Sequence, residues 1–281
     1  MTPRVSIVVP AYNNEAYIAE TMRSVLAQTF GDFEVVVADH SSTDRTQELL
    51  EPFTEDPRVR LLDTPAGGGA GRNWNRVTNE AAGELVKLVC GDDVLYPDAL
   101  ATQVAAFDSS GPGVAMVAST RDIVDASGRV VVRNHGLGGL TGRVPGATAL
   151  RRGVTRGANI FGEPCCVLLR GETLAAVGGW HGEPSYMIDQ GTYSRVLLHG
   201  DLVAAPGPVA AFRLSSTQLS VQLVREQADS AALMHRQLAE LAPGTLSSRD
   251  VRRGNTMARL RSFQRRLVYQ YLGWRMKPNA R

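Results

Sequence analysis

The chain has 281 residues, of which 43% are hydrophobic and 21% charged, and this composition excludes a disordered or collagen-like protein. Its 30 Lys and Arg residues against 28 Asp and Glu give a formal net charge of +2, which argues against a wholly basic nucleic-acid binder. The charge is uneven, because residues 243–281 carry nine Arg and one Lys but a single acid, Asp250. We therefore expect an acidic body followed by a basic tail.

No targeting or membrane-spanning segment is predicted. The N-terminus lacks the apolar stretch of a signal peptide, and no run approaches the about 20 apolar residues of a membrane helix. Cys90, Cys165 and Cys166 form no CxxC pair, so a disulfide framework or a zinc site is not expected. These features favour a protein of the reducing cytoplasm.

Strand and helix patterns alternate through the first third of the chain. Short β-branched runs predict buried strands at residues 5–9, 33–38, 59–62 and 85–89. Apolar spacing and capping residues predict helices that begin near Asn13, after residues 41–44 and at about residue 72. Three strand–helix–strand passages favour a mostly parallel sheet flanked by helices, which is an α/β fold.

The remainder of the chain is less regular. Strands are predicted at residues 114–119, 123–132, 164–169 and 209–214, with a turn at residues 126–128 inside the second, and a helix at 190–199. Glycines crowd residues 136–157, where we predict a loop-rich segment without a regular element. Beyond Ser216 the pattern is helical, with a break at Pro243-Gly244.

Polar side chains gather where the four predicted N-terminal strands end. They are Tyr12, Asn13 and Glu15 after the first strand, Asp39 after the second, Arg72 beyond the third, and Asp92-Asp93 after the fourth. In a parallel sheet these ends face one crevice beside helix N-termini. An aromatic ring, a carboxylate, a cation and an acid pair suit a nucleoside diphosphate.

The Asp92-Asp93 pair is the sharpest of these signals. Two adjacent carboxylates repel each other unless a cation neutralises them, and hard oxygen ligands suit Mg²⁺ or Mn²⁺. The alternative is that one of the two caps the next helix. Asp39 could likewise be a turn residue and Tyr12 a packing residue.

The glycine loop argues against a dehydrogenase. Residues 67–72 fall one residue short of G-x-G-x-x-G, and they follow the third strand, whereas the dinucleotide fingerprint follows the first.

Taken together, the motifs resemble family-2 glycosyltransferases of the GT-A fold over about residues 4–215. The resemblance is carried by residues 5–13 (VSIVVPAYN), 28–30, 33–39, 42–44, 70–73 (AGRN), 82–84, 91–93 (GDD) with Pro97, 169–170, 177–180, 188–189 and Arg195. It implies a donor-binding half, residues 1–93, an acceptor half, residues 94–215, and a helical basic extension, residues 216–281.

The resemblance also implies roles for individual residues. Residues Pro10, Ala11, Tyr12 and Asn13 would border the nucleotide, Asp39 would accept a hydrogen bond from a uracil-type N–H, and Arg72 would approach the nucleotide. Asp92 would lie near the ribose, and Asp93 would ligate Mn²⁺ or Mg²⁺ at the diphosphate. Asp189 matches the catalytic base of inverting members, although it could also cap the helix that follows.

The chain departs from the family pattern at four positions. His40 stands where a second Asp often follows Asp39, and Cys90 replaces an Asp two residues before the acid pair. Ile188 precedes the base where a Glu is common, and Ser215 replaces a late His. These departures keep a catalytically inactive nucleotide-sugar-binding module as an alternative, and a sugar-nucleotidyltransferase is a second.

The expected function is metal-dependent, inverting transfer of a sugar from a nucleotide-diphosphate sugar, expected to be a UDP-sugar, to an acceptor hydroxyl. The acceptor would be a glycan or a lipid-linked molecule in cell-surface polysaccharide or glycoconjugate synthesis, and no nucleic-acid partner is expected.

The basic tail carries an apolar helical stripe. Its members are Met257, Leu260, Phe263, Leu267, Tyr271 and Trp274. Such a helix either packs on the body or on another subunit, or lies on an anionic membrane as a peripheral contact.

Overall fold

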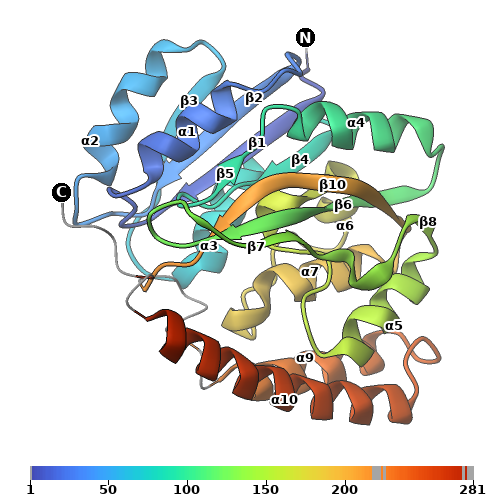
Figure 1. Ribbon diagram of the computed structural model, residues 1–281. Coiled ribbons are helices and arrows are strands. Elements are labelled where there is room, and N and C mark those ends of the chain that lie inside the picture. Colours follow the sequence, from blue (N-terminus) through green and yellow to red (C-terminus); the bar gives the residue numbers. More distant parts are fainter. Residues whose placement is uncertain (1, 217–222, 224–225, 274–275, 277–281) are drawn as a thin grey trace.

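The computed structural model describes residues 2–216, 223, 226–273 and 276. One ten-stranded sheet runs through it, with the strand order β3-β2-β1-β4-β9-β6-β10-β5, while β7 pairs with β6 and β8 with β10. Helices cover both faces of this sheet, and two C-terminal helices lie along one edge of the molecule (Figure 1).

The N-terminal part is the predicted parallel unit. Its strands are β1 (Val5–Ala11), β2 (Phe33–Asp39), β3 (Val59–Asp63) and β4 (Leu85–Leu88). β1 pairs in parallel with β2 and β4, and β2 with β3. The helices are α1 (Ile18–Leu26), α2 (Thr46–Leu50), extended by the 3₁₀ turn η1 (Glu51–Glu55), and α3 (Gly69–Asn79). Every residue of β1 is buried, as its β-branched sequence predicts.

The second part of the sheet is mixed, although parallel pairing prevails in the sheet as a whole, as predicted. Its strands are β5 (Val94–Leu95), β6 (Val114–Val124), β7 (Val130–His135), β8 (Gly142–Val144), β9 (Val167–Arg170) and β10 (Asp201–Arg213). β9 lies antiparallel between β4 and β6, whereas β6 and β10 are parallel. The predicted strand at 123–132 is divided between β6 and β7 by the turn at its centre.

The glycine-crowded segment is more regular than predicted. It contains β8 and the helix α5 (Gly146–Arg156), preceded by the short turn η2 (Leu137–Gly139). A Cβ on Gly146 would lie 2.0 Å from the Leu197 carbonyl oxygen, so this glycine allows α5 to approach its neighbour closely. Gly146 therefore allows close packing between elements, and the helix propensity of the local sequence does not indicate this.

The remaining helices before the C-terminal extension lie in the second part of the chain. They are α4 (Ala99–Ser109), α6 (Gly171–Ala176) and α7 (Ile188–Val196), with the 3₁₀ turns η3 (Pro164–Cys166) and η4 (Ser185–Met187). Residues 164–166, predicted as strand, form η3, because Pro164 cannot donate to a strand ladder. The helix predicted from residue 190 begins two residues earlier, at Ile188.

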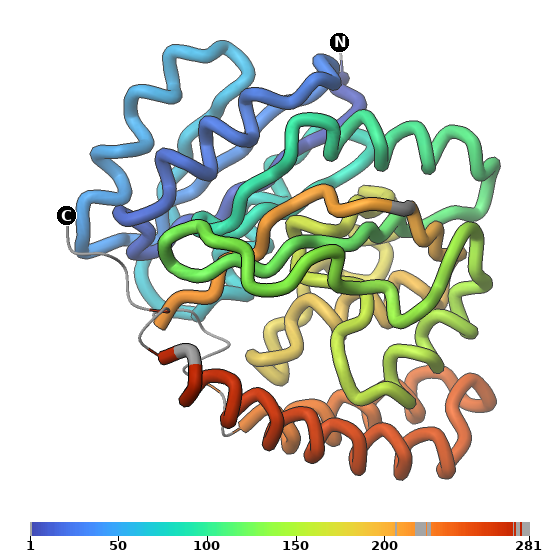
Figure 2. The backbone as a smooth tube through the Cα atoms, in the orientation of Figure 1, coloured from blue at the N-terminus to red at the C-terminus, as the bar shows by residue number. Residues whose placement is uncertain are grey.

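The C-terminal extension is a helical pair, α9 (Gln227–Leu241) and α10 (Ser248–Leu272), broken at Pro243-Gly244 as predicted. A capping box between Ser247 and Asp250 begins α10. A Cβ on Gly157 would lie 2.3 Å from the Ala258 backbone nitrogen, so the end of α5 and the middle of α10 touch through their backbones. Figure 2 shows α10 running along this edge of the body. None of the described helices is long and apolar enough to cross a membrane.

Candidate active site

The carboxyl ends of the parallel strands meet as predicted. Ala11 of β1 lies beside Asp39 of β2, which lies beside Asp63 of β3. The Asn73 side chain joins the first two strands, because its Nδ2 donates to the Ala11 and Ala38 carbonyl oxygens, each at 3.2 Å. Its Oδ1 accepts from Thr64 at 2.7 Å. Asn73, to which the sequence assigned no role, therefore fixes α3 against the strand ends.

Asp39 is 3% exposed and forms a local turn. Its two carboxylate oxygens accept from the Ser42 backbone N–H, at 2.9 Å, and from the Ser42 hydroxyl, at 2.5 Å. The same hydroxyl oxygen accepts from the Asn13 N–H at 2.9 Å. The loops after β1 and β2 are thereby tied together, with Asp39 as the buried carboxylate between them.

Tyr12 stands out from this turn, with 57% of its surface exposed. Its ring lies 5.9 Å from the His40 ring, centroid to centroid. His40 Nε2 forms a hydrogen bond of 2.9 Å with the Gly67 carbonyl oxygen. The residue that departs from the family pattern therefore anchors the glycine loop. Pro10 and Ala11, by contrast, are buried inside β1.

Arg72 lies on the exposed side of α3, one turn from the glycine loop. Its Nη1 donates to the Ala66 carbonyl oxygen at 3.2 Å and to that of Gly67 at 3.4 Å. The guanidinium is therefore folded back on the loop that His40 anchors, at the mouth of the same strand ends.

The two members of the acid pair lie in different environments. Asp93 is 1% exposed, and its Oδ1 accepts from the Arg213 backbone N–H at 3.2 Å. Burial first, and the neighbouring Asp92 carboxylate second, raise the pKa of Asp93 well above its usual value. Asp92 is half-buried, and its carbonyl oxygen accepts from Arg213 Nε at 3.0 Å. Arg213, whose guanidinium also pairs with Glu20 at 2.7 Å, is a site residue that the sequence did not single out.

The acid pair supplies carboxylate oxygens of the kind that divalent cations take as ligands. Asp93 Oδ2 is buried without a partner that meets hydrogen-bond geometry, although the Cys165 thiol stabilises this carboxylate. Among the described residues no group of three or more His, Cys, Asp or Glu could ligate a metal. Burial also raises the pKa of Cys90 and keeps its thiol neutral, so this position adds no charge to the pair.

Asp189 lies in the first turn of α7, where two donors orient its carboxylate. The Gln190 N–H donates to Oδ1 at 2.7 Å, and Asn159 Nδ2 donates to Oδ2 at 2.6 Å. Burial nevertheless dominates, and it raises the pKa of Asp189 to about 7, with Glu163 adding to the shift. A carboxyl group with this pKa can take up a proton near neutral pH.

Asp189 and the acid pair act on a common neighbour. After burial, the charges of Asp93, Asp92 and Asp189 all raise the pKa of the Cys90 thiol. The two ends of the predicted site, which lie about a hundred residues apart in the sequence, therefore converge in the fold.

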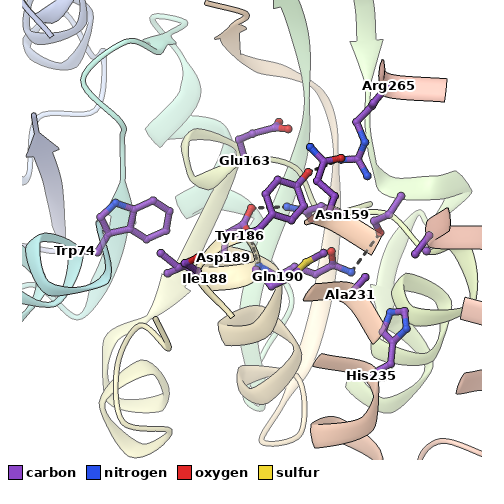
Figure 3. Close-up of a pocket in the computed structure, with 16 residues that line it drawn as sticks. Trp74, Asn159, Glu163, Tyr186, Ile188, Asp189, Gln190, Ala231, His235 and Arg265 are labelled. Atoms are coloured by element: carbon purple, nitrogen blue, oxygen red, sulfur yellow. Dashed lines mark hydrogen bonds between the residues drawn. The ribbon is translucent and has the colours of Figure 1, made fainter. Parts of the chain in front are cut away.

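A cavity of about 170 Å³ opens beside Asp189 (Figure 3). The C-terminal helices form one wall of it, through Ala231 and His235 of α9 and Arg265 of α10. Arg265 Nη1 donates to the Tyr186 hydroxyl at 2.5 Å. The sequence did not predict Asn159, Tyr186 or Arg265 as site residues, because only the tertiary fold brings them to Asp189.

The fold is that of the GT-A glycosyltransferase structures. The chain matches residues 1–349 of Staphylococcus aureus TarS, solved in complex with UDP-GlcNAc, with a TM-score of 0.68 and 20% identity, over 93% of this chain and 73% of that one. It also matches the mannosyltransferase PcManGT from Pyrobaculum calidifontis, solved with GDP-Man and Mn²⁺, with a TM-score of 0.64 and 18% identity, over 94% of this chain and 70% of that one.

The sequence comparisons identify the family. The model of "Glycosyl transferase family 2" matches residues 6–176, and the chain belongs to this family rather than to the sugar-nucleotidyltransferases. It is 31% identical to the uncharacterized protein MT1568 of Mycobacterium tuberculosis over 73% of this chain and 65% of that protein. It is 35% identical to the poly(ribitol-phosphate) beta-N-acetylglucosaminyltransferase TarS of S. aureus over 40% of this chain and 20% of that protein. The chain thus spans less than two thirds of the length of either relative.

Proposed function

We propose that this enzyme transfers a sugar from a UDP-sugar to a hydroxyl group of a glycan or lipid-linked acceptor, with inversion and with a divalent cation. The observation that carries the proposal is Asp189, a carboxylate with a pKa of about 7 that lines a cavity at the start of α7. Such a carboxylate is poised to accept a proton from an acceptor hydroxyl.

The donor would lie across the ends of β1 to β4. The exposed Tyr12 ring offers a surface for the base, and Asn13 lies beside it. Asp39 would accept an N–H from the uracil, since a carboxylate oxygen can accept more than one hydrogen bond. Arg72 would turn from the glycine loop toward the diphosphate.

The acid pair would hold the cation. Asp92, the half-buried member, is the more accessible of the two, and the predicted ligand Asp93 is buried next to it in the chain. Bound Mg²⁺ or Mn²⁺ would stabilise the negative charge that develops on the diphosphate leaving group. This replaces the second carboxylic acid that glycoside hydrolases need.

On the acceptor side, Asp189 would take the hydroxyl proton as the oxygen attacks the anomeric carbon opposite the leaving diphosphate. Asn159 and the Gln190 N–H hold the carboxylate in one orientation for this step. Attack from the face opposite the leaving group inverts the anomeric centre.

The relatives support this choice of substrates. The matched TarS structure is a complex with UDP-GlcNAc, and the PcManGT structure is a complex with GDP-Man and Mn²⁺. A further relative, the succinoglycan biosynthesis protein ExoO of Rhizobium meliloti, is 35% identical over 45% of this chain and 36% of that protein. A role in cell-surface polysaccharide or glycoconjugate synthesis is consistent with these relatives.

The test is release of UDP from a panel of UDP-sugars, measured in Mn²⁺ and in EDTA. We expect turnover of at least one UDP-sugar in Mn²⁺ and none in EDTA, and Asp92→Asn and Asp93→Asn should each weaken UDP binding in Mn²⁺. Donor binding without turnover of any donor would instead indicate a nucleotide-sugar-binding module.

A further inference from the structure

The apolar stripe of the C-terminal tail faces outward. Five large apolar side chains of α10 are 46% to 81% exposed, namely Leu260, Phe263, Leu267, Val268 and Tyr271. The first three and Tyr271 recur at intervals of three and four residues, which places them on one face of the helix. Trp274, the last member of the predicted stripe, lies outside the described residues. We call these five residues the outer stripe.

The opposite face of α10 makes the contacts with the body, and it does so through small residues. Gly254, Ala258 and Ser262 are buried. A Cβ on Gly254 would lie 2.5 Å from the Val154 carbonyl oxygen of α5. The helix is therefore docked through its small residues, and its large apolar residues are left in water. This is the reverse of an ordinary surface helix.

Beyond its first turn, α10 itself carries charge of one sign, whereas Asp229 and Glu240 of α9 line a groove beside its N-terminal half. From residue 251 to residue 273 the chain contains six Arg and no Asp or Glu, and Asp250, at the start of the helix, is buried. Arg253 and Arg259 are exposed, the former in line with the stripe and the latter beside it. An apolar strip bordered by cations matches the interface of an anionic bilayer, where side chains enter the acyl boundary and guanidinium groups meet lipid phosphates.

We propose that α10 docks this protein on an anionic lipid surface through the outer stripe and the arginines beside it. A second copy of the chain is a poorer occupant, because two such helices face to face would bring their arginines together. The outer stripe also lies near the Asp189 cavity. Arg265, on the inner side of the same helix, contacts Tyr186 at the Asp189 cavity, so the lipid would lie about one helix diameter, ~10 Å, from that cavity.

The test is co-sedimentation of the full chain with vesicles of phosphatidylcholine, alone or mixed with phosphatidylglycerol. We expect retention on the mixed vesicles only, and release in high salt, where the Debye length falls to about 3 Å. The triple variant Leu260→Gln, Phe263→Gln, Leu267→Gln should bind at least ~100-fold more weakly, because three apolar side chains no longer insert. Arg253→Gln and Arg259→Gln should each weaken binding about fivefold.

The matched control replaces exposed apolar residues elsewhere, with Val130→Thr and Val132→Thr on β7 and Leu241→Gln at the end of α9. This control should bind as the unmodified chain does. All substituted side chains are exposed, so we expect unchanged circular dichroism spectra and melting temperatures. If the triple variant does not fold, the single variant Phe263→Gln replaces it in the vesicle test.

Three results would overturn the proposal. They are no retention on anionic vesicles, equal retention of the triple variant and the control, and a dimer in light scattering that the triple variant disperses. Because the readout is lipid binding, it is independent of whether any sugar donor is turned over.

Discussion

At the scale of single residues, Asp189 shows how burial raises the pKa of a carboxyl group into the neutral range. Two hydrogen-bond donors favour its charged form, yet burial outweighs them and brings its pKa to about 7. The same burial is expected to reduce the stability of the fold, as is common for groups retained for function.

The first prediction concerns the pH dependence of the rate. The base works only when it is deprotonated, so kcat/KM should rise with pH and level off above about 7. Asn159→Leu removes a hydrogen-bond donor to the Asp189 carboxylate, so it should raise the pKa of Asp189 and move the rise in kcat/KM to higher pH. A rise in kcat/KM centred near pH ~4, the range of an unperturbed carboxyl group, would show that Asp189 is not the titrating base.

The second prediction concerns stability. The pKa of Asp189 in the folded chain lies above the value of about 3.9 in an unfolded chain, so the folded state holds this proton more tightly. The contribution of Asp189 to stability is therefore greatest below pH ~4 and is lost as the pH rises to about 7. The melting temperature of Asp189→Asn, relative to the unmodified chain, should rise by several degrees between pH 5 and pH 8, as expected for a change of about 2–3 kcal/mol. A constant difference across this range would contradict the assigned pKa.

The rule that ligand-binding residues follow the strands of a parallel sheet predicted where part of the candidate site lies. The rule does not apply to residues that tertiary packing brings in from other segments. Asp39, Arg72 and the acid pair could be found because each follows a strand of the same parallel unit. Asn159 and Arg265 could not, since they reach Asp189 from segments 30 and 76 residues away, through packing that no local pattern records.

At the scale of elements, glycines decide how α5 and α10 fit together. Gly157 ends α5 with a φ of +57° and allows the two backbones to touch. Composition alone indicated a loop in this region, because glycine lowers helix propensity whether or not it serves packing. The contact with α10 explains why α5 contains glycines, and this contact cannot be read from the local sequence.

Two alanine substitutions separate backbone strain from packing. Gly142 has a φ of +63° with nothing within 4 Å of an added Cβ, so Gly142→Ala should cost only the strain of a left-handed residue, about 1 kcal/mol. Gly157→Ala adds a collision with the backbone of α10 and should cost ~2–3 kcal/mol more. Urea unfolding midpoints measure the loss of unfolding free energy in each variant. An equal loss in Gly142→Ala and Gly157→Ala would mean that α5 and α10 are not docked as described.

At the scale of the whole molecule, the C-terminal extension is part of the enzyme body. α10 packs on α5 and on α9, and the two C-terminal helices form one wall of the Asp189 cavity. The division predicted after residue 215 falls at the end of β10, but residues of the helices beyond it line the same cavity as Asp189.

Removal of residues 247–281 should therefore lower the melting temperature and abolish turnover, because it uncovers buried residues of α5 and opens the cavity. Differential scanning fluorimetry and UDP release provide the readouts. A truncated chain with unchanged stability and activity would show that α10 is an independent appendage, and point substitutions on the outer stripe avoid this ambiguity.

The central claim, that Asp189 performs the chemistry while the strand ends bind the donor, is tested most directly by comparing kcat with donor affinity in Asp189→Asn. Turnover should fall by about 10²–10⁴-fold, the usual contribution of a positioned base, while the Kd for the UDP-sugar, measured by calorimetry in Mn²⁺, stays nearly unchanged. An unaltered kcat, or a loss of donor affinity as large as the loss of rate, would contradict the account.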